Sequence, residues 1–318
     1  ITGGFGTIDT GSSNITTTGV GAFGSLDISG DIDVDGTTNL DAVDVDGAVN
    51  FAADVTFADG ADIITASAGT SNFRAGVNAG NSIQSGGNFN TVLGDEAGTA
   101  ITTGDDNVAV GYAAGDAMTT GSYNAIVGKN SGGAITTGVE NVSVGWNSLD
   151  ALTEGGQNVA LGASALGSDT LGSRSVAVGY QALTTQNFTT ATDAHNTAVG
   201  YKAGEAVTTG ANNTIIGANT GLVLTSDYNV AIGQQALNSD TLGSQTVAIG
   251  SFALSAQNYT TATNSLNTAV GYAAGAAING SAAGAGDQNT LIGGLTGDAL
   301  TIGRRNAAIQ VILSQQAR

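Results

Sequence analysis

The chain has 318 residues, with 50 glycines, no proline, no cysteine and 5% aromatic residues, which is too little bulky side chain for two ordinary globular cores. A net charge of −19 with only 7 lysines and arginines argues against binding to nucleic acid or to an anionic membrane surface. No stretch approaches the roughly 20 apolar residues of a membrane-spanning helix, and the lack of cysteine excludes disulfides and thiolate metal sites.

The first predicted region, residues 1–71, is rich in aspartate. Residues 1–65 contain eleven aspartates and no lysine or arginine, and their apolar residues alternate with polar ones, as Val43 and Val45 do. Such alternation predicts short strands with one buried face. Strands this short enclose no core within one chain, so we expect a thin β-shaft in which three chains wind together.

The same region holds the candidate metal ligands. The segment that starts at Asp31 resembles the beginning of a helix–loop–helix calcium loop, but its twelfth position is Ala42 instead of glutamate. We therefore predict solvated carboxylates and no cofactor. Calcium binding remains the alternative for Asp31, Asp33, Asp35, Asp44 and Asp46.

Residues 72–305 repeat a unit of about 17 residues, which predicts a solenoid. The copies begin Asn-x-x-x-Gly, except that Ser175 and Thr246 each replace the asparagine once and Gln310 replaces the glycine of the last copy. The copies start at residues 72, 90, 107, 124, 141, 158, 175, 196, 213, 229, 246, 267, 289 and 306. The rhythm ends at residues 306–318, which we interpret as a C-terminal cap or a junction.

Each unit predicts one coil made of strand, glycine corner, strand, glycine corner. In the copy that starts at Asn107, we expect Val108 and Val110 to fill the interior and Ala109 to pack against a close neighbour. Gly111 would form the first corner. A second short strand is expected at residues such as 100–104, 134–138 and 206–210.

One coil cannot fold alone. Burying about three aliphatic side chains contributes roughly 6 kcal/mol, whereas ordering 17 residues costs on the order of 20 to 30 kcal/mol. Stacked coils cover each other's faces, as in other solenoids. We therefore predict an all-β fold of stacked short strands, in which equivalent residues form ladders along the stack.

A longer duplication contains the candidate recognition residues. The stretch from Asn158 matches the stretch from Asn229 at an offset of 71, and both lengthen one coil from 17 to 21 residues. A third insertion lies near residues 279–287. Insertions that leave the register intact must bulge outward, so we predict receptor contacts at Asn187, Phe188, Thr189, Asn258, Tyr259 and Thr260, and also at the aromatic Trp146.

Trp146 belongs to a column of aromatic residues five places after the asparagine, with Tyr112, Tyr180, Tyr201 and Tyr272. Packing against the next coil or chain is the favoured interpretation, and stacking on sugar rings is the alternative. No catalytic residues are predicted. The lone His195 has no partner cluster, Asp105 and Asp106 point apart, and Asp169 and Asp240 lie four coils apart.

The motif Asn-Thr-Ala-Val-Gly-Tyr-x-Ala-Gly at residues 196–204 and 267–275 resembles the repeat of bacteriophage tail fibres. Ser-Val-Ala-Val-Gly at residues 175–179 also resembles the head repeat of trimeric autotransporter adhesins. The resemblance implies a homotrimer of parallel left-handed β-rolls with valine and isoleucine inside. In fibres of this type a C-terminal self-cleaving chaperone domain is often lost after assembly. The 17-residue unit is longer than the typical adhesin repeat, which favours the fibre.

We therefore predict a structural, non-enzymatic, extracellular fibre on a virion, a homotrimer that joins other tail proteins at one end and a host-surface glycan or protein at the other. A bacterial surface adhesin is the first alternative and a glycan-degrading tailspike the second. Ice binding by threonine columns is disfavoured, because neighbouring threonines point to opposite faces.

Overall fold

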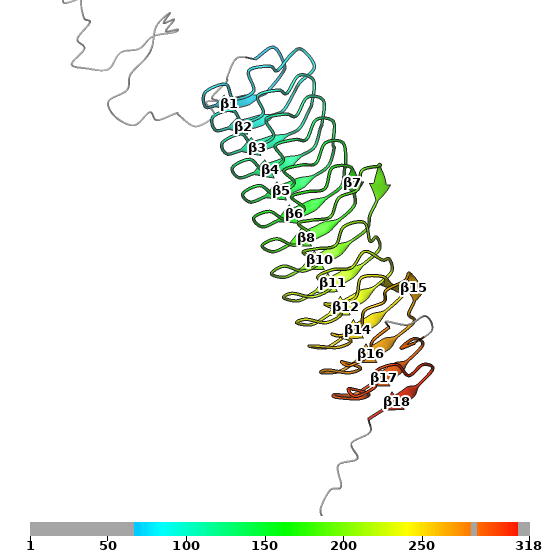
Figure 1. The fold of residues 1–318 in the computed structure, drawn as a ribbon. Helices are drawn as coiled ribbons and strands as arrows, with labels where there is room; N and C mark the ends of the chain where they lie inside the picture. Colours follow the sequence, from blue (N-terminus) through cyan, green and yellow to red (C-terminus); the bar gives the residue numbers. More distant parts are fainter. Residues whose placement is uncertain (1–66, 281–284, 311–318) are drawn as a thin grey trace, which may run out of the picture. The chain divides into compact units, whose positions relative to one another are not determined.

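The computed structural model describes residues 67–280 and 285–310, which belong to one compact unit. They form a β-solenoid of stacked coils with a strand on the same side of every coil (Figure 1). The predicted all-β solenoid is confirmed. Within these residues no helix has the length and apolarity needed to cross a membrane. The predicted shaft and its five candidate calcium ligands lie outside the described residues.

The main sheet is parallel and has fourteen strands in the order β1-β2-β3-β4-β5-β6-β8-β10-β11-β12-β14-β16-β17-β18. Each strand pairs with the next coil in an unshifted register, so Val108 lies opposite Ala125 and Val110 opposite Val127. The strands are β1 (Phe73–Ala75), β2 (Thr91–Leu93), β3 (Val108–Val110), β4 (Ala125–Val127), β5 (Val142–Val144), β6 (Val159–Leu161), β8 (Val176–Val178), β10 (Thr197–Val199), β11 (Thr214–Ile216), β12 (Val230–Ile232), β14 (Val247–Ile249), β16 (Thr268–Val270), β17 (Thr290–Ile292) and β18 (Ala307–Ile309).

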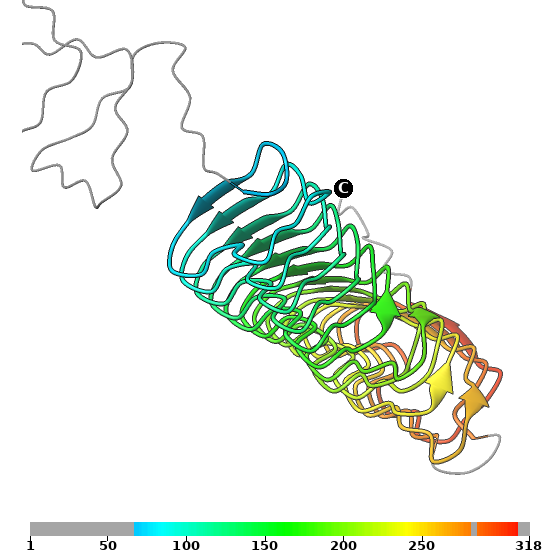
Figure 2. The same cartoon turned by 90° about the horizontal axis from the view of Figure 1, so that it is seen from above.

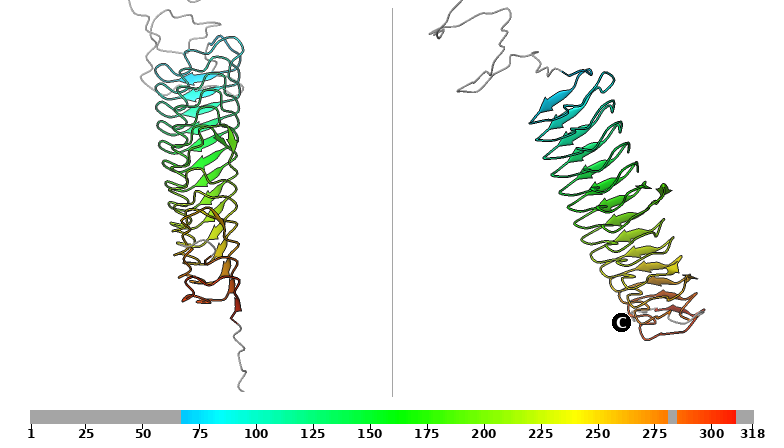
Figure 3. Two further views of the ribbon diagram at one scale, coloured as in Figure 1. Left: turned by 45° about the vertical axis from the view of Figure 1, so that its right-hand side comes forward. Right: turned by 45° about the horizontal axis from the view of Figure 1, so that its top comes forward.

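Two small parallel sheets accompany the insertions. One pairs β7 (Gly172–Ser173) with β9 (Thr192–Asp193), and the other pairs β13 (Gly243–Ser244) with β15 (Thr263–Asn264). Figure 2 and the right panel of Figure 3 show these strands on a different side of the coil stack from the main sheet. The insertions therefore project beside the stack without interrupting the main sheet.

The strands face the opposite way from the sequence-based prediction. Numbering each coil from its asparagine as position 1, the residue at position 3 is the buried one. Ala109 is fully buried, whereas Val108 is 38% exposed. The prediction that valines fill the roll was wrong, because the interior is too narrow for two bulky columns on the strand side.

The interior is filled mainly from the far side of the coil. Position 8 is alanine or serine in all described coils but two, which have threonine, and position 12 supplies a large side chain in most coils, such as Ile101, Met118, Ile135 and Leu152. These side chains pack against the small residues of the strand. Each coil therefore contributes about one large and two small residues to the core.

The second strand of the coil does not form in the regular repeats. Residues 102–104 have no strand assignment, and Thr102 joins the next coil by a single backbone bond from its N–H to the Thr119 carbonyl, 2.9 Å long. Its hydroxyl donates to the same carbonyl at 3.0 Å. A threonine ladder therefore replaces the predicted strand.

A ladder of buried asparagines runs along the stack at position 1. The side chain Nδ2 of Asn107 donates to Oδ1 of Asn90 at 3.1 Å and to the carbonyl of Gly121 at 2.8 Å. Oδ1 of Asn90 also accepts the backbone N–H of Asn107 at 3.0 Å. Each asparagine thus links its coil to the previous one and closes its own coil on itself.

The first corner requires glycine. Gly128 has φ +133°, and a Cβ there would lie 2.6 Å from the carbonyl oxygen of Gly145 in the next coil. The corresponding glycines of the other coils have the same conformation, from Gly76 to Gly293. This column lets consecutive corners stack in backbone contact.

We expect Gly128→Ala to lower the stability of the solenoid by about 2 kcal/mol or more, because the substitution adds both backbone strain and a clash. The matched control is Gly294→Ala, since Gly294 has an ordinary φ and a Cβ there would lie 4.0 Å from its nearest atom. Thermal unfolding followed by circular dichroism measures both. Equal midpoints for the two variants would contradict a special role for the corner.

Candidate functional site

The main sheet carries an apolar outer face, which we call the strand face: positions 2 and 4 of all fourteen coils. Position 4 is aliphatic throughout, position 2 is apolar in nine coils and threonine in five, and neither position contains a charged residue. Val108 and Val142 are each 38% exposed, and Leu161 is 46% exposed. At about 4.8 Å per coil the stripe extends for about 65 Å. A continuous apolar stripe of this length is typical of an interaction surface.

An exposed aromatic column borders the strand face at position 6. Tyr112, Trp146 and Tyr272 are each more than half exposed. Tyr180 and Tyr201 stack with their ring centroids 5.5 Å apart. Tyr272 packs edge-on against Phe252 of the previous coil, with the ring centroids 6.1 Å apart. The expected packing between coils is thus seen at these residues, while Trp146, a predicted receptor contact, keeps 55% of its surface exposed.

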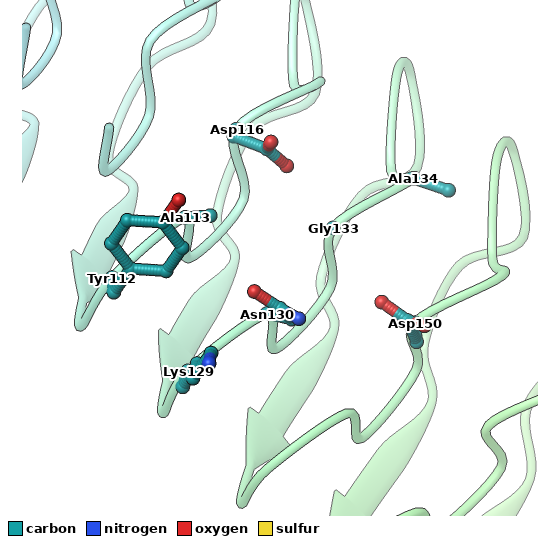
Figure 4. Close-up of a pocket in the computed structure, with 8 residues that line it drawn as sticks. All are labelled: Tyr112, Ala113, Asp116, Lys129, Asn130, Gly133, Ala134 and Asp150. Atoms are coloured by element: carbon teal, nitrogen blue, oxygen red, sulfur yellow. The ribbon is translucent and has the colours of Figure 1, made fainter. Parts of the chain in front are cut away.

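A surface pocket opens beside this column where three coils meet (Figure 4). Asp116 and Asp150 lie at position 10 of coils that flank Gly133, and their Oδ1 atoms are 3.5 and 3.1 Å from the place where a Cβ of Gly133 would be. The two carboxylates therefore face the same point. The pocket is lined by Tyr112, Ala113, Asp116, Lys129, Asn130, Gly133, Ala134 and Asp150.

The electrostatics of the pocket are dominated by this acidic pair. Burial raises the pKa of Asp116, and the charge on Asp150 raises it further. Burial also raises the pKa of Asp150. Lys129 lies at the other wall, with its ammonium 5.6 Å from the centre of the Tyr112 ring. The pocket thus combines a cation, an aromatic ring and two carboxyls in neighbouring coils.

Sequence reasoning did not identify Asp116 and Asp150. They are 34 residues apart in the chain, and neither belongs to the conserved-looking motif of the repeat. Aligning the coils by position would have shown Asp116, Gly133 and Asp150 in one column. Gly133 is the residue that indicates the pocket, because it has no side chain to separate the two carboxylates.

The insertions do not present their aromatic residues to solvent. Phe188 is 7% exposed and Tyr259 is 1% exposed, so these two rings lie inside the chain, and receptor contact at these two residues stays a prediction. The hydroxyl of Tyr259 donates to the Gly286 carbonyl at 2.7 Å. These two rings anchor the insertions. The predicted contacts Thr189, Asn258 and Thr260 are exposed, and Asn187 is half-buried.

A buried polar cluster stands under each insertion. Oδ1 of Asp169 accepts the backbone N–H groups of Gly172 and Phe188 at 3.0 and 3.1 Å. Its Oδ2 accepts from Nε2 of Gln186, whose Oε1 accepts from Asn196 at 2.8 Å. Burial raises the pKa of Asp169 despite these donors. The second copy repeats the cluster at Asp240, Gln257 and Asn267.

Asp169 and Asp240 therefore each tie the base of an insertion to the stack. His195 is exposed at the end of the first insertion. Asp105 accepts the backbone N–H of Asn88 at 2.6 Å, while Asp106 points to solvent. Residues 67–280 and 285–310 contain no group of three or more histidine or acidic residues placed to hold a metal ion.

No protein-family model matches the chain, and neither a curated protein nor a solved structure is significantly similar to it.

The acidic pair predicts a specific pH dependence. Because the folded-state pKa values of Asp116 and Asp150 are raised, the folded chain binds more protons than the unfolded chain above the ordinary carboxyl pKa. The free energy of unfolding should therefore fall as the pH rises from the ordinary carboxyl pKa to the raised folded-state pKa, and it should stay low at neutral pH. Asp116→Asn should therefore raise the free energy of unfolding at pH 7. The gain should be less than about 1 kcal/mol, because both carboxyl groups are partly exposed.

The same variant should gain less stability than the wild type between pH 7 and about pH 4, which is close to the ordinary carboxyl pKa. Thermal unfolding at the two pH values measures the difference. Asp106→Asn, at an exposed position between Phe89 and Tyr123 in neighbouring coils, is the control and should leave the pH dependence unchanged. A variant at position 116 that is less stable than the wild type at pH 7 would contradict the destabilisation that we attribute to the buried carboxylate.

Proposed function

We propose that the chain is the rod of a homotrimeric fibre on a virion, serving as spacer and as host-surface attachment protein. The observation that carries this proposal is the strand face, an apolar, uncharged stripe along the whole stack. A single chain leaves Leu161 and Val127 partly in water. Association through this face would remove the stripe from solvent, and apolar burial is the main favourable term in association.

Further copies of this chain are the partner that fits the strand face. The face has ridges that recur once per coil, and a partner that interdigitates with them must repeat at the same spacing over the same length. Another copy of the chain does so when it runs parallel and in register. The number three comes from the resemblance to trimeric fibres, and three copies around one axis form a closed assembly.

The attachment function is supported by the separation of the surfaces. The strand face would be enclosed by association, whereas the insertions stand on a different side of each chain (Figure 2). Thr189, Asn258 and Thr260 are exposed there. A rigid rod with lateral insertions suits a protein that holds binding surfaces away from a particle.

The oligomeric state tests the proposal. The wild-type protein should sediment as a trimer. The double variant Val127→Lys, Leu161→Lys should dissociate it, because each lysine would be buried without a partner charge in the assembly. The single chain should tolerate lysine at these positions, because Val127 and Leu161 are 37% and 46% exposed. The circular dichroism spectrum should therefore remain unchanged.

The matched control is Thr103→Lys, Thr137→Lys, which places the same charges at exposed position 14 of two coils. This variant should remain trimeric. A wild-type protein that sediments as a monomer at micromolar concentration would overturn the fibre proposal. Dissociation by both variants would show that charge alone, and not the strand face, governs the assembly.

A second candidate function is glycan hydrolysis at the pocket in Figure 4, favoured by the facing carboxylates of Asp116 and Asp150. Glycosidases use two carboxyl groups, one of them kept protonated by a raised pKa. Incubation with host-envelope glycans should then release new reducing ends, and Asp116→Asn and Asp150→Asn should each abolish the release. Glycans that remain intact would refute hydrolysis at this pocket and would leave the fibre proposal unaffected.

A further inference from the structure

The internal duplication offers two versions of one surface, at a groove between the stack and the small sheet beside each insertion. Three side chains along this groove differ between the copies, although the surrounding sequence is nearly the same. Gln157, Arg174 and Asp193 of the first copy correspond to Tyr228, Gln245 and Asn264 of the second. The copies therefore share a backbone arrangement and differ in surface chemistry.

In the first copy these three side chains satisfy each other. Nε of Arg174 donates to Oε1 of Gln157 at 2.8 Å, and the guanidinium forms an ion pair with Asp193. The ion pair bridges the stack to β9. The groove is therefore spanned by charged side chains that are already paired.

In the second copy all three side chains are neutral and leave a pocket. The Tyr228 ring is 59% exposed, and Gln245 and Asn264 are exposed. Oδ1 of Asn264 accepts from the Ser244 hydroxyl at 3.0 Å, which leaves its amide N–H groups for other partners. Among the described residues, no hydrogen bond occupies the Tyr228 hydroxyl or the Gln245 side chain. The pocket is lined by Thr225, Ser226, Asp227, Tyr228, Leu242, Ser244, Gln245, Ala262 and Asn264.

The lining indicates the chemical class of the ligand. It offers one aromatic face, the donors and acceptors of two neutral amides, several hydroxyls and the Asp227 carboxylate, and it contains no cation. A phosphate, sulfate or carboxylate ligand would lack a counter-charge and would face both Asp227 and a chain of net charge −19. An apolar ligand would leave the amides unsatisfied.

We propose that the pocket at Tyr228, Gln245 and Asn264 binds a neutral saccharide unit. The apolar C–H face of a pyranose packs on the Tyr228 ring, and its hydroxyls donate to Asp227 and exchange hydrogen bonds with the two amides. The first copy does not bind, because Arg174 and Asp193 fill the equivalent groove. The inference deepens the proposed attachment function and depends on it for its biological use.

Saturation-transfer NMR on the purified chain tests the site. The probes are glucose, galactose, mannose, N-acetylglucosamine and N-acetylgalactosamine with their disaccharides, and glucuronic and sialic acids as charged counterparts. We expect transfer to at least one neutral sugar and none to the acids. No transfer to any neutral sugar, or preference for the acids, would overturn the proposal.

The chain supplies its own matched variant. The triple variant Tyr228→Gln, Gln245→Arg, Asn264→Asp converts the second groove into the first, a surface that the fold already accommodates. It should abolish transfer, and Tyr228→Ala should weaken binding at least about tenfold. Tyr123→Ala removes a similarly exposed tyrosine that also directly precedes the asparagine of a coil, and it should leave binding intact. Unchanged binding in the triple variant would refute the assignment.

The two proposals fail in different ways. Sugar binding is tested on the purified protein, whereas the fibre proposal is tested by sedimentation and by adsorption to host cells. A trimer that adsorbs equally with and without the triple substitution would refute this pocket as the attachment site while leaving the fibre in place. A monomer that still binds a neutral sugar at Tyr228 would refute the fibre alone.

Discussion

The structure depends on the buried asparagine at position 1 of the coil. Its amide donates to the asparagine of the previous coil and to a carbonyl 14 residues later in its own coil, as Asn107 does to Gly121. In an interior of alanine and aliphatic side chains, an unsatisfied amide or carbonyl in every coil would offset a large part of that coil's few apolar contacts. This one side chain therefore sets both the stacking and the length of the coil.

Coils that depart from 17 residues show how strict this constraint is. Where the coil lengthens after Ser175, the asparagine is absent and Gln186 supplies the amide from the other side, held by Asp169. These polar residues occupy position 12, which is aliphatic in regular coils, and Leu183 at position 9 replaces the usual glycine to refill the core. In the coil of Asn267 the same amide reaches Gly286, 19 residues on, across a longer loop.

The sequence is sufficient to predict what the period dictates: the solenoid, the asparagine and glycine columns, and the location of the insertions. It misleads about which side of the strand is inside. A three-residue strand such as Val108–Val110 alternates equally well with either face inward, and the deciding fact is the width of the coil, which is set by Met118 and its equivalents on the far side. The acidic pocket is formed by residues at equivalent positions of consecutive coils, so it can be recognised only when the register between the coils is known.

The division of positions within a coil also limits where recognition can evolve. Positions 1, 3, 5, 8 and 12 are fixed by the ladder, the corner and the core, and the strand face keeps position 4 aliphatic and position 2 apolar or threonine. Variation is left to positions 6, 7 and 10, which form the pocket around Asp116, and to positions 13–17, which form the groove around Tyr228. A substitution there changes the surface of one coil and leaves the neighbouring coils stacked, since each repeat contacts only its neighbours. The duplicated groove illustrates this freedom, because Arg174 and Gln245 occupy the same position on the same backbone and give two different chemistries.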